Sequence, residues 1–248
     1  MDGTGLRPAM SLTRLLLPGR PIVAGRQRVP PEVARHAVVN RVGPGDLVEL
    51  CDLAGTVGIA RVLAWQGKAC EVEVVEIVSG RGELPVPVVL ALAVLHSQAF
   101  DWAVEKATEL GVSEIVPVLT ARVQGTRHEG RVERWQRIAD AAVSQCGRSL
   151  APAVRAPQPL QVVIDSRSSF TRLVADPVAV ALPALPAERG ILVLIGPEGG
   201  FDDDECDRIR AAGFAGLPLG SRTLRAETAA VAALSVAQAL AGLFVSPA

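Results

Sequence analysis

The sequence of 248 residues has no tyrosine and only two lysines, Lys68 and Lys106, and aromatic residues make up 3% of it. A platform of aromatic side chains for stacking single-stranded nucleic acid is therefore not expected. The formal net charge is −1, so no global basic field draws the protein to polyanions, and any nucleic-acid surface must be a local patch. Hydrophobic residues make up 49% and charged residues 21%, which is typical of a folded chain and not of a disordered one.

Cysteine and histidine are also scarce and scattered. The four cysteines, Cys51, Cys70, Cys146 and Cys206, form no C-x-x-C pair, and there are only three histidines. No spacing therefore indicates a metal site, and no arrangement indicates a catalytic triad. Four separate thiols in a chain of this length predict reduced cysteines in a cytoplasmic protein.

Long hydrophobic runs are missing as well. Residues 1–11 contain no apolar core of the kind found in a secretory signal, and we interpret them as an extension. The longest apolar runs are 84–95, which is too short to cross a bilayer, and 228–245, which is rich in alanine and interrupted by polar residues. We therefore expect no membrane-spanning segment.

The first third of the chain alternates short apolar runs with turns. A helix from the Pro30-Pro31 pair to Arg41 is predicted, because proline is tolerated in the first helical turn. Period-two alternation of apolar and polar residues is clearest at 69–78. Strands are predicted at 12–17, 46–52, 57–65 and 69–78. Residues 12–80 are therefore expected to form a small β barrel or sandwich, with a linker at 79–83.

After the linker the pattern changes to strands that alternate with helices. The run at 86–94 is continuously apolar, as expected for a strand buried on both faces. Further strands are predicted at 115–119, 171–176, 191–195 and 217–219. Helices are predicted at 99–110, 131–146, 203–212 and 227–244. This alternation predicts that residues 84–248 form an α/β domain with a mostly parallel sheet.

Two loops in this second domain are candidates for ligand binding, because each leaves a predicted strand and enters a predicted helix. The first, 196–200, has three glycines, which permit close approach of the backbone to a ligand. It matches neither the dinucleotide nor the triphosphate motif, so a tight turn without ligand is the alternative. The second, 219–228, combines Gly220, Arg222, Arg225 and Glu227, and helix capping is the alternative for the carboxylate.

Arginine is concentrated in two stretches, 1–41 and 122–148. Such stretches in a neutral protein suggest local contacts with phosphate. The alternative, a solvated helix face, is the better interpretation for the arginines at 131, 134 and 137. Arg148, beside Gly147 at a predicted helix end, is a stronger candidate for an anion contact. His36, next to Arg35, is more simply a structural histidine.

Five groups of residues together resemble one protein family. They are 36–41 with 45–46, 105–112, 134–138 with 145–148, 194–201, and 219–220 with 224–229. The chain resembles the 16S ribosomal RNA (uracil-N3) methyltransferases, the small subunit methyltransferase E group of the SPOUT superfamily, from about residue 12 to the C-terminus. It departs from the family pattern at 96–101, where a basic residue and a K-G-[DE] element are missing. It also lacks the hydroxyl residue that often follows Arg122.

The resemblance implies a fold and an activity that the residue pattern alone does not. Residues 12–80 would be a PUA-like RNA-binding barrel, and residues 84–248 a SPOUT domain with a trefoil knot. The protein would be a cytoplasmic homodimer that uses S-adenosylmethionine. Its substrate would be one uridine of 16S rRNA in the 30S subunit, methylated at N3, and it would need neither a metal nor a membrane.

The resemblance also assigns residues to the site. Arg35, His36, Arg122 and Arg148 are expected to bind RNA. The predicted cofactor-binding residues are Leu194, Ile195, Gly196, Glu198, Gly199, Gly200, Leu219, Gly220, Leu224, Arg225 and Thr228.

The predicted catalytic residues are Arg225 and Glu227. Arg225 is the expected cation beside the uracil oxygens, where it would favour the N3 anion. Either Glu198 or Glu227 would take the proton or hold ribose hydroxyls. Three alternatives stay open at this point: a methyltransferase of the same fold on another RNA, a non-catalytic RNA-binding protein, and a metabolic α/β enzyme on a nucleotide substrate.

Overall fold

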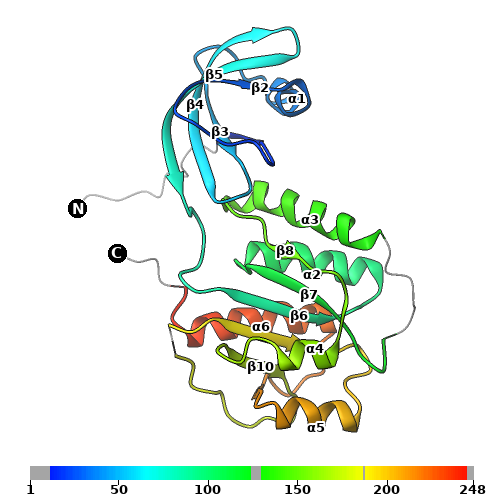
Figure 1. Ribbon diagram of the computed structural model, residues 1–248. Coiled ribbons are helices and arrows are strands. Elements are labelled where there is room, and N and C mark those ends of the chain that lie inside the picture. The colour runs from blue at the N-terminus through cyan, green and yellow to red at the C-terminus, as the bar shows by residue number, and fades with distance from the viewer. Residues whose placement is uncertain (1–11, 124–129, 187, 245–248) are drawn as a thin grey trace, which may run out of the picture. The chain divides into compact units, whose positions relative to one another are not determined.

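The structure is a computed structural model that describes residues 12–123, 130–186 and 188–244. The predicted extension at 1–11 lies outside these ranges. The chain divides into two compact units, Met1–Arg81 and Gly82–Ala248 (Figure 1). Each unit has its own sheet and its own hydrophobic core.

The first unit is built on a five-stranded sheet in the order β1-β3-β4-β5-β2. Strand β1 pairs in parallel with β3, and the other pairs are antiparallel. A helix, α1, begins with proline as predicted and buries Ala34 and Ala37 against the sheet core. The elements are β1 (Thr13–Leu16), β2 (Gly25–Val29), α1 (Pro31–Val39), β3 (Leu47–Cys51), β4 (Thr56–Gln66) and β5 (Ala69–Ser79).

Strand β2 was not predicted from the sequence. Among the strands that the structure describes it pairs only with β5, and just one of its five residues, Val29, is buried. Arg26 and Arg28 are both exposed, and their pairing positions on β5 are Glu73 and Glu71. An edge strand of this kind has almost no apolar pattern to recognise.

The second unit has a sheet in which every described pairing is parallel, in the order β12-β10-β11-β6-β7-β8, with β9 also paired to β7. The strands are β6 (Val88–Ala93), β7 (Glu114–Leu119), β8 (Ala153–Val154), β9 (Gln158–Pro159), β10 (Thr171–Ala175), β11 (Ile191–Ile195) and β12 (Ala215–Leu217). All residues of β6 and β11 are buried. The predicted α/β fold with a parallel sheet is therefore confirmed.

Helices cover both faces of this sheet. Alternate residues of the central strands belong to two separate cores, and one core includes residues of α2 (Ser97–Glu109), α3 (Arg131–Cys146) and α6 (Ala226–Leu240). The other core includes residues of α4 (Leu160–Asp165) and α5 (Asp203–Ala211). On the first face, the rings of Phe100 and Trp135 pack with centroids 4.3 Å apart.

The predictions and the structure differ most clearly in three places. The last strand, β12, ends at Leu217 where the prediction began, and α6 ends at Leu240 instead of 244. The proline-rich segment 151–159, for which no strand was predicted, contains β8 and β9, and α4 follows it. The helix α4 was not predicted because its six residues are too few to show helical periodicity in the sequence. Within the described residues, no helix has the length and apolar character needed to cross a membrane.

Candidate functional site

The site lies at the carboxyl edge of the parallel sheet. Because the strands are parallel, the loops that follow β10, β11 and β12 leave from the same edge. Ligands of open α/β sheets bind at this edge. A cavity of about 540 Å³ opens there, within the size range of small-molecule sites. The two loops singled out in the sequence, at 196–200 and 219–228, both contribute to its lining.

Most of the predicted cofactor-binding residues line this cavity. They are Ile195, Gly196, Glu198, Gly200, Leu219, Gly220 and Leu224. Leu194 is instead fully buried in the core on the α4 and α5 face. Gly199 lines a second cavity, and neither Arg225 nor Thr228 lines either of the two.

Three glycines of these loops are required by the backbone or by packing. Gly200 has a φ of +70° and Gly220 a φ of +93°, values that L-residues with a side chain rarely adopt. At Gly196, a Cβ atom would lie 3.0 Å from the ring of Phe201. A larger residue at these positions would therefore change the shape of the cavity wall.

Sequence reasoning missed several residues of the same cavity. Asp176 follows β10, and its carboxylate accepts a hydrogen bond from the backbone N–H of Val178 at 2.9 Å. Arg210 and Cys206 come from α5. The signal that could have found Asp176 is its place directly after a parallel strand, because polar residues there converge with those of neighbouring strands.

Cys206 is the cysteine of this cavity. Burial is the largest influence on its thiol and raises the pKa above the ordinary value, whereas the nearby Arg210 lowers the pKa by less. The thiolate is therefore scarce at neutral pH, which makes this cysteine a slow nucleophile.

The start of α5 is fixed to the neighbouring strand loop by one buried carboxylate. Asp202 caps the helix and accepts the backbone N–H of Glu205 at 2.8 Å, and Glu205 in turn accepts the backbone N–H of Asp202. The other oxygen of Glu205 accepts the N–H of Ala121, which follows β7, at 2.8 Å. These contacts hold the β7 loop beside the loop that follows β11.

A second cavity of about 520 Å³ lies along the same edge of the sheet. Its lining comes from the loops after β6, β7 and β11, and it includes His96, Arg122, Glu198 and Gly199. Arg122 donates a hydrogen bond from Nη1 to the carbonyl of Gly199. Within the described residues, no group of three His, Cys, Asp or Glu side chains is placed to hold a metal.

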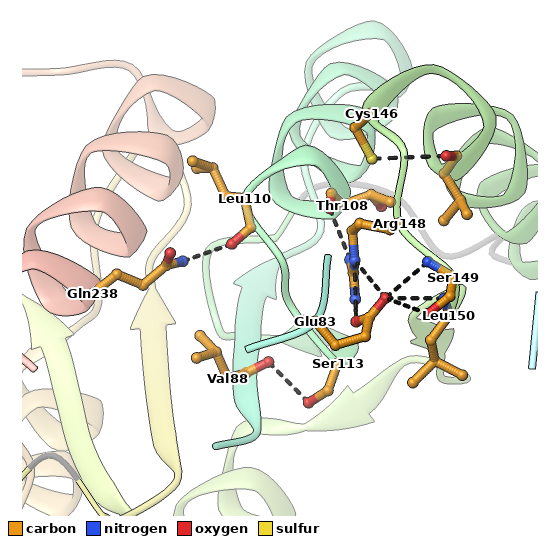
Figure 2. Close-up of polar contacts among 11 residues, drawn as sticks. Glu83, Val88, Thr108, Leu110, Ser113, Cys146, Arg148, Ser149, Leu150 and Gln238 are labelled. Carbon is orange, nitrogen blue, oxygen red and sulfur yellow. Dashed lines mark hydrogen bonds and ion pairs between the residues drawn. The ribbon is translucent and has the colours of Figure 1, made fainter. Parts of the chain in front are cut away.

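The structure contradicts the predicted role of Arg148 in RNA binding. We expected it to contact an anionic ligand, but its side chain is only 3% exposed and pairs with the carboxylate of Glu83 at 2.6 Å. Its Nη1 also donates to the carbonyl of Thr108 at 2.7 Å. Figure 2 shows the guanidinium lying between these two groups. Arg148 therefore has a structural role: its contacts connect α2 and the end of α3 to Glu83 at the start of this unit.

The remaining predicted residues are more exposed. Arg35 and His36 are both exposed on α1, so neither side chain belongs to the hydrophobic core. Arg225 is the N-cap residue of α6 and is exposed, and Glu227 is half-buried in the first turn of that helix. Neither lines the two cavities of this chain.

Comparisons with known proteins agree with this geometry. A family model described as an RNA methyltransferase domain matches residues 82–238. The chain is 34% identical over 166 residues to the ribosomal RNA small subunit methyltransferase E of Mesomycoplasma hyopneumoniae, covering 64% of this chain and 72% of that protein. It is 27% identical over 217 residues to the protein of the same name from Bacillus subtilis, covering 81% and 85%.

A solved structure gives the same result for the whole chain. The ribosomal RNA small subunit methyltransferase E of Neisseria gonorrhoeae, bound to S-adenosyl methionine, matches with a TM-score of 0.83 and 31% identity. The match covers 92% of this chain and 98% of that one. The chain therefore belongs to the RNA methyltransferase family, in the group of the ribosomal RNA small subunit methyltransferase E proteins.

Proposed function

We propose that this protein transfers a methyl group from S-adenosylmethionine to N3 of one uridine in the 16S rRNA of the small ribosomal subunit. The observation that carries the proposal is the convergence of two glycine-bearing strand loops on one cavity at the carboxyl edge of the parallel sheet. The relative from Neisseria gonorrhoeae, solved with S-adenosyl methionine, supports it.

The residues of the larger cavity fit S-adenosylmethionine. Phe201, Ile209 and Phe214 provide an apolar wall for a flat base. Arg210 and Arg222 offer cations for the carboxylate of the methionine part, and Asp176 offers an anion for the sulfonium. The backbone at Gly196, Gly200 and Gly220 permits close approach, as proposed above for the loops. When bound, S-adenosylmethionine supplies an electrophilic methyl carbon on a positively charged sulfur.

The catalytic contribution of the chain itself is mainly orientation. N3 of uracil must lose its proton before it can attack, and the transfer then cancels charge. A site that fixes the acceptor against the donor and excludes water provides much of the rate. A cation near the uracil oxygens adds to it by favouring the N3 anion. Within one chain the lining of the second cavity offers Arg122 for this role, in place of the Arg225 expected from the sequence.

For RNA binding we propose the first unit, as a PUA-like domain. Arg26, Arg28, Arg35, His36 and Arg41 are all exposed in it. By contrast, Arg14 is buried and paired with Glu49 at 2.8 Å, so it is not part of this surface. Counterion release from phosphate contacts would make the affinity for RNA fall as salt rises.

We also propose the remaining features that accompany this family: a trefoil knot in the second unit, a homodimer whose substrate site is completed by the partner subunit, and a cytoplasmic location. The likeness to the Neisseria gonorrhoeae structure over nearly the whole chain supports the knot. Light scattering of the purified protein measures the oligomeric state directly, and a strictly monomeric active enzyme would overturn the dimer.

The experiment that tests the function has two steps. Calorimetry measures S-adenosylmethionine binding to the purified protein, and mass spectrometry of digested RNA then locates the methyl group after incubation with 30S subunits lacking the modification. We expect binding and a single 3-methyluridine. Failure to bind the methyl donor would favour a plain RNA-binding protein, methylation of free nucleosides would favour a metabolic enzyme, and methylation only of another RNA would redirect the substrate.

A further inference from the structure

We infer that the second cavity receives the target uracil and that the carboxylate of Glu198 takes the proton from N3. The inference rests on the proposed function and deepens it. The sequence alone does not distinguish Glu198 from Glu227 as the base. The structure separates them.

The strand order places Glu198 between two binding sites. Strand β11 lies between β10 and β6 in the sheet, and Glu198 belongs to the loop that leaves β11. The cavity lined by the loops 196–200 and 219–228, proposed above to hold S-adenosylmethionine and called here the donor cavity, lies over β12, β10 and β11. The second cavity lies over β11, β6 and β7. The loop at 196–200 is therefore the partition between the two.

Glu198 is the one residue that appears in the described lining of both cavities. Glu227, in the first turn of α6, appears in neither. A group that removes a proton from the acceptor must lie within hydrogen-bond reach of that acceptor while the acceptor faces the methyl donor. Within one chain, a residue on the partition meets this condition, whereas a residue outside both cavities could meet it only in the site of a partner subunit.

The Glu198 carboxylate is also available for the reaction. It is exposed, and within the described part of the chain it forms no hydrogen bond or ion pair. The other carboxylates near the site differ from it: Glu205 accepts two backbone hydrogen bonds that cap α5 and hold the β7 loop, and Asp176 lines only the cavity proposed for the methyl donor. A carboxylate already bound by several donors is a poor proton acceptor, because those bonds stabilise its anionic form.

The charged groups around Glu198 suit a flat, polar, neutral base. Arg122 and His96 lie on the side of the second cavity, and each can donate to a uracil carbonyl oxygen. One guanidinium hydrogen bond of Arg122 goes to Gly199, which leaves further N–H donors. On the side of the donor cavity the charged residues are Asp176, Arg210 and Arg222.

The step balances without any further reactant. The proton on N3 moves to the Glu198 carboxylate, and the N3 electron pair forms the bond to the methyl carbon. The bond between that carbon and sulfur breaks, and its electron pair stays on sulfur, which becomes neutral. The resulting carboxylic acid is exposed, so it returns its proton to water before the next cycle.

The first test is kinetic and uses Glu198→Gln, which preserves shape and removes the base. Loss of a positioned general base typically costs about 10²–10⁴-fold, so we expect a fall of at least about a hundredfold in turnover on 30S subunits. Affinity for S-adenosylmethionine, measured by calorimetry, should change by only a few-fold. Below the pKa of free uridine N3, the residual rate should rise about tenfold per pH unit, because hydroxide must then provide the N3 anion.

A matched control removes a carboxylate that has no place in the site. Asp204→Asn alters an exposed residue in the first turn of α5 that lines neither cavity, and turnover should stay at the wild-type level. Glu227→Gln tests the alternative base. A larger loss in Glu227→Gln than in Glu198→Gln, or an effect of Glu198→Gln on cofactor affinity alone, would overturn the inference.

The second test does not depend on turnover. The probe is a short RNA with the target uridine, or with 3-methyluridine in its place, titrated by fluorescence onto protein saturated with S-adenosylhomocysteine. Wild-type protein should prefer uridine, because Glu198 accepts its N3–H, and Glu198→Ala should reduce that preference several-fold. An unchanged preference would contradict the role of Glu198.

A cavity-filling variant tests the location of the base. Ala121→Phe adds a ring to a residue that lines only the second cavity. It should weaken binding of the uridine RNA at least tenfold and leave cofactor affinity within a few-fold. If this variant methylates 30S subunits at the wild-type rate, the uracil binds elsewhere, although the proposed function would stand. If wild-type protein methylates no RNA, the proposed function itself fails.

Discussion

Glu83 and Arg148, 65 positions apart in the sequence, form a buried ion pair at the start of the second unit. The carboxylate of Glu83 accepts from Nη2 of Arg148 at 2.6 Å and from Nε at 3.2 Å. The same carboxylate accepts the backbone N–H groups of Ser149 at 3.1 Å and Leu150 at 2.9 Å. Figure 2 shows these bonds meeting at one carboxylate. The guanidinium of Arg148 and the carboxylate of Glu83 therefore form most of their hydrogen bonds within the fold.

This arrangement predicts that Arg148→Ala destabilises the protein without weakening RNA binding directly. The variant leaves Glu83 partly buried without its main partner, and breaking a buried pair typically costs about 3–5 kcal/mol. We expect a clear fall in the thermal midpoint. Arg148→Lys should recover only part of it, because an ammonium cannot reproduce the planar fork.

Arg134→Ala is the matched control for Arg148→Ala. Arg134 also pairs with a carboxylate, that of Asp101, but its own side chain is 58% exposed. Exposed pairs contribute about 0–1 kcal/mol, so its midpoint should barely move. If Arg148→Ala kept wild-type stability but bound 30S subunits weakly, the phosphate contact first expected of Arg148 would be right after all.

A second prediction concerns the loop glycine Gly220. Its φ of +93° is a strained conformation for any residue with a branched side chain. Gly220→Val should therefore displace the loop that lines the donor cavity and reduce affinity for S-adenosylmethionine at least tenfold in calorimetry. Gly130→Val, which has positive φ but lies at the start of α3 away from both linings, controls for general strain. Equal cofactor affinity in wild type and Gly220→Val would show that this loop does not hold the cofactor.

The third prediction uses the cysteines as reporters. Cys206 lines the donor cavity, whereas Cys146 is exposed on α3 and lines neither cavity. Mass spectrometry after treatment with iodoacetamide should show that S-adenosylmethionine protects Cys206 and leaves Cys146 unprotected.

The pH dependence of the same labelling has a definite sign. Because burial raises the pKa of the Cys206 thiol, less than half of the thiol is ionised at the ordinary thiol pKa. The labelling rate of Cys206 should therefore keep rising with pH above that point. In the control variant Cys206→Ser, iodoacetamide labelling at position 206 should be absent. Labelling of Cys206 at the same rate with and without S-adenosylmethionine would place the cofactor outside this cavity.

Much of the second unit could be predicted from sequence because its signals are local. The bounds predicted for 131–146 and 191–195 agree with α3 and β11. The helix is delimited by Gly130 and Gly147, both with positive φ, and the strand is a continuous apolar run. The contribution of the loops 196–200 and 219–228 to the first cavity was also predictable, since a loop between a strand and a helix that bears several glycines is itself a local feature.

The second cavity could not be predicted in the same way. It requires the loop after β11 to lie beside the loops after β6 and β7, although about 75–100 residues separate them in the sequence. That neighbourhood follows only from the strand order β11-β6-β7, which no local pattern specifies. For the same reason Arg148 was assigned to a ligand: its partner, Glu83, is remote in sequence.

The last prediction compares two arginines as the cation that favours the N3 anion. Arg122 lines the second cavity, whereas Arg225 is exposed at the start of α6 and lines neither cavity of its own chain. If the uracil binds in the second cavity, Arg122→Ala should reduce turnover by about a hundredfold, the cost of one preorganised donor to a developing oxyanion. Arg225→Ala should lose distinctly less.

Cofactor affinity separates a catalytic role of Arg122 from a structural one. Arg122 also holds the carbonyl of Gly199, so its loss can disturb the partition between the cavities. Arg122→Lys keeps the charge and loses the fork that allows contact with Gly199 and the base together, so it should be only partly active. In both variants, calorimetry should give near wild-type affinity for S-adenosylmethionine. The opposite ranking, with Arg225→Ala the slower enzyme and its rate recovering as pH rises, would mean that Arg225 provides the cation to the active site of a partner subunit.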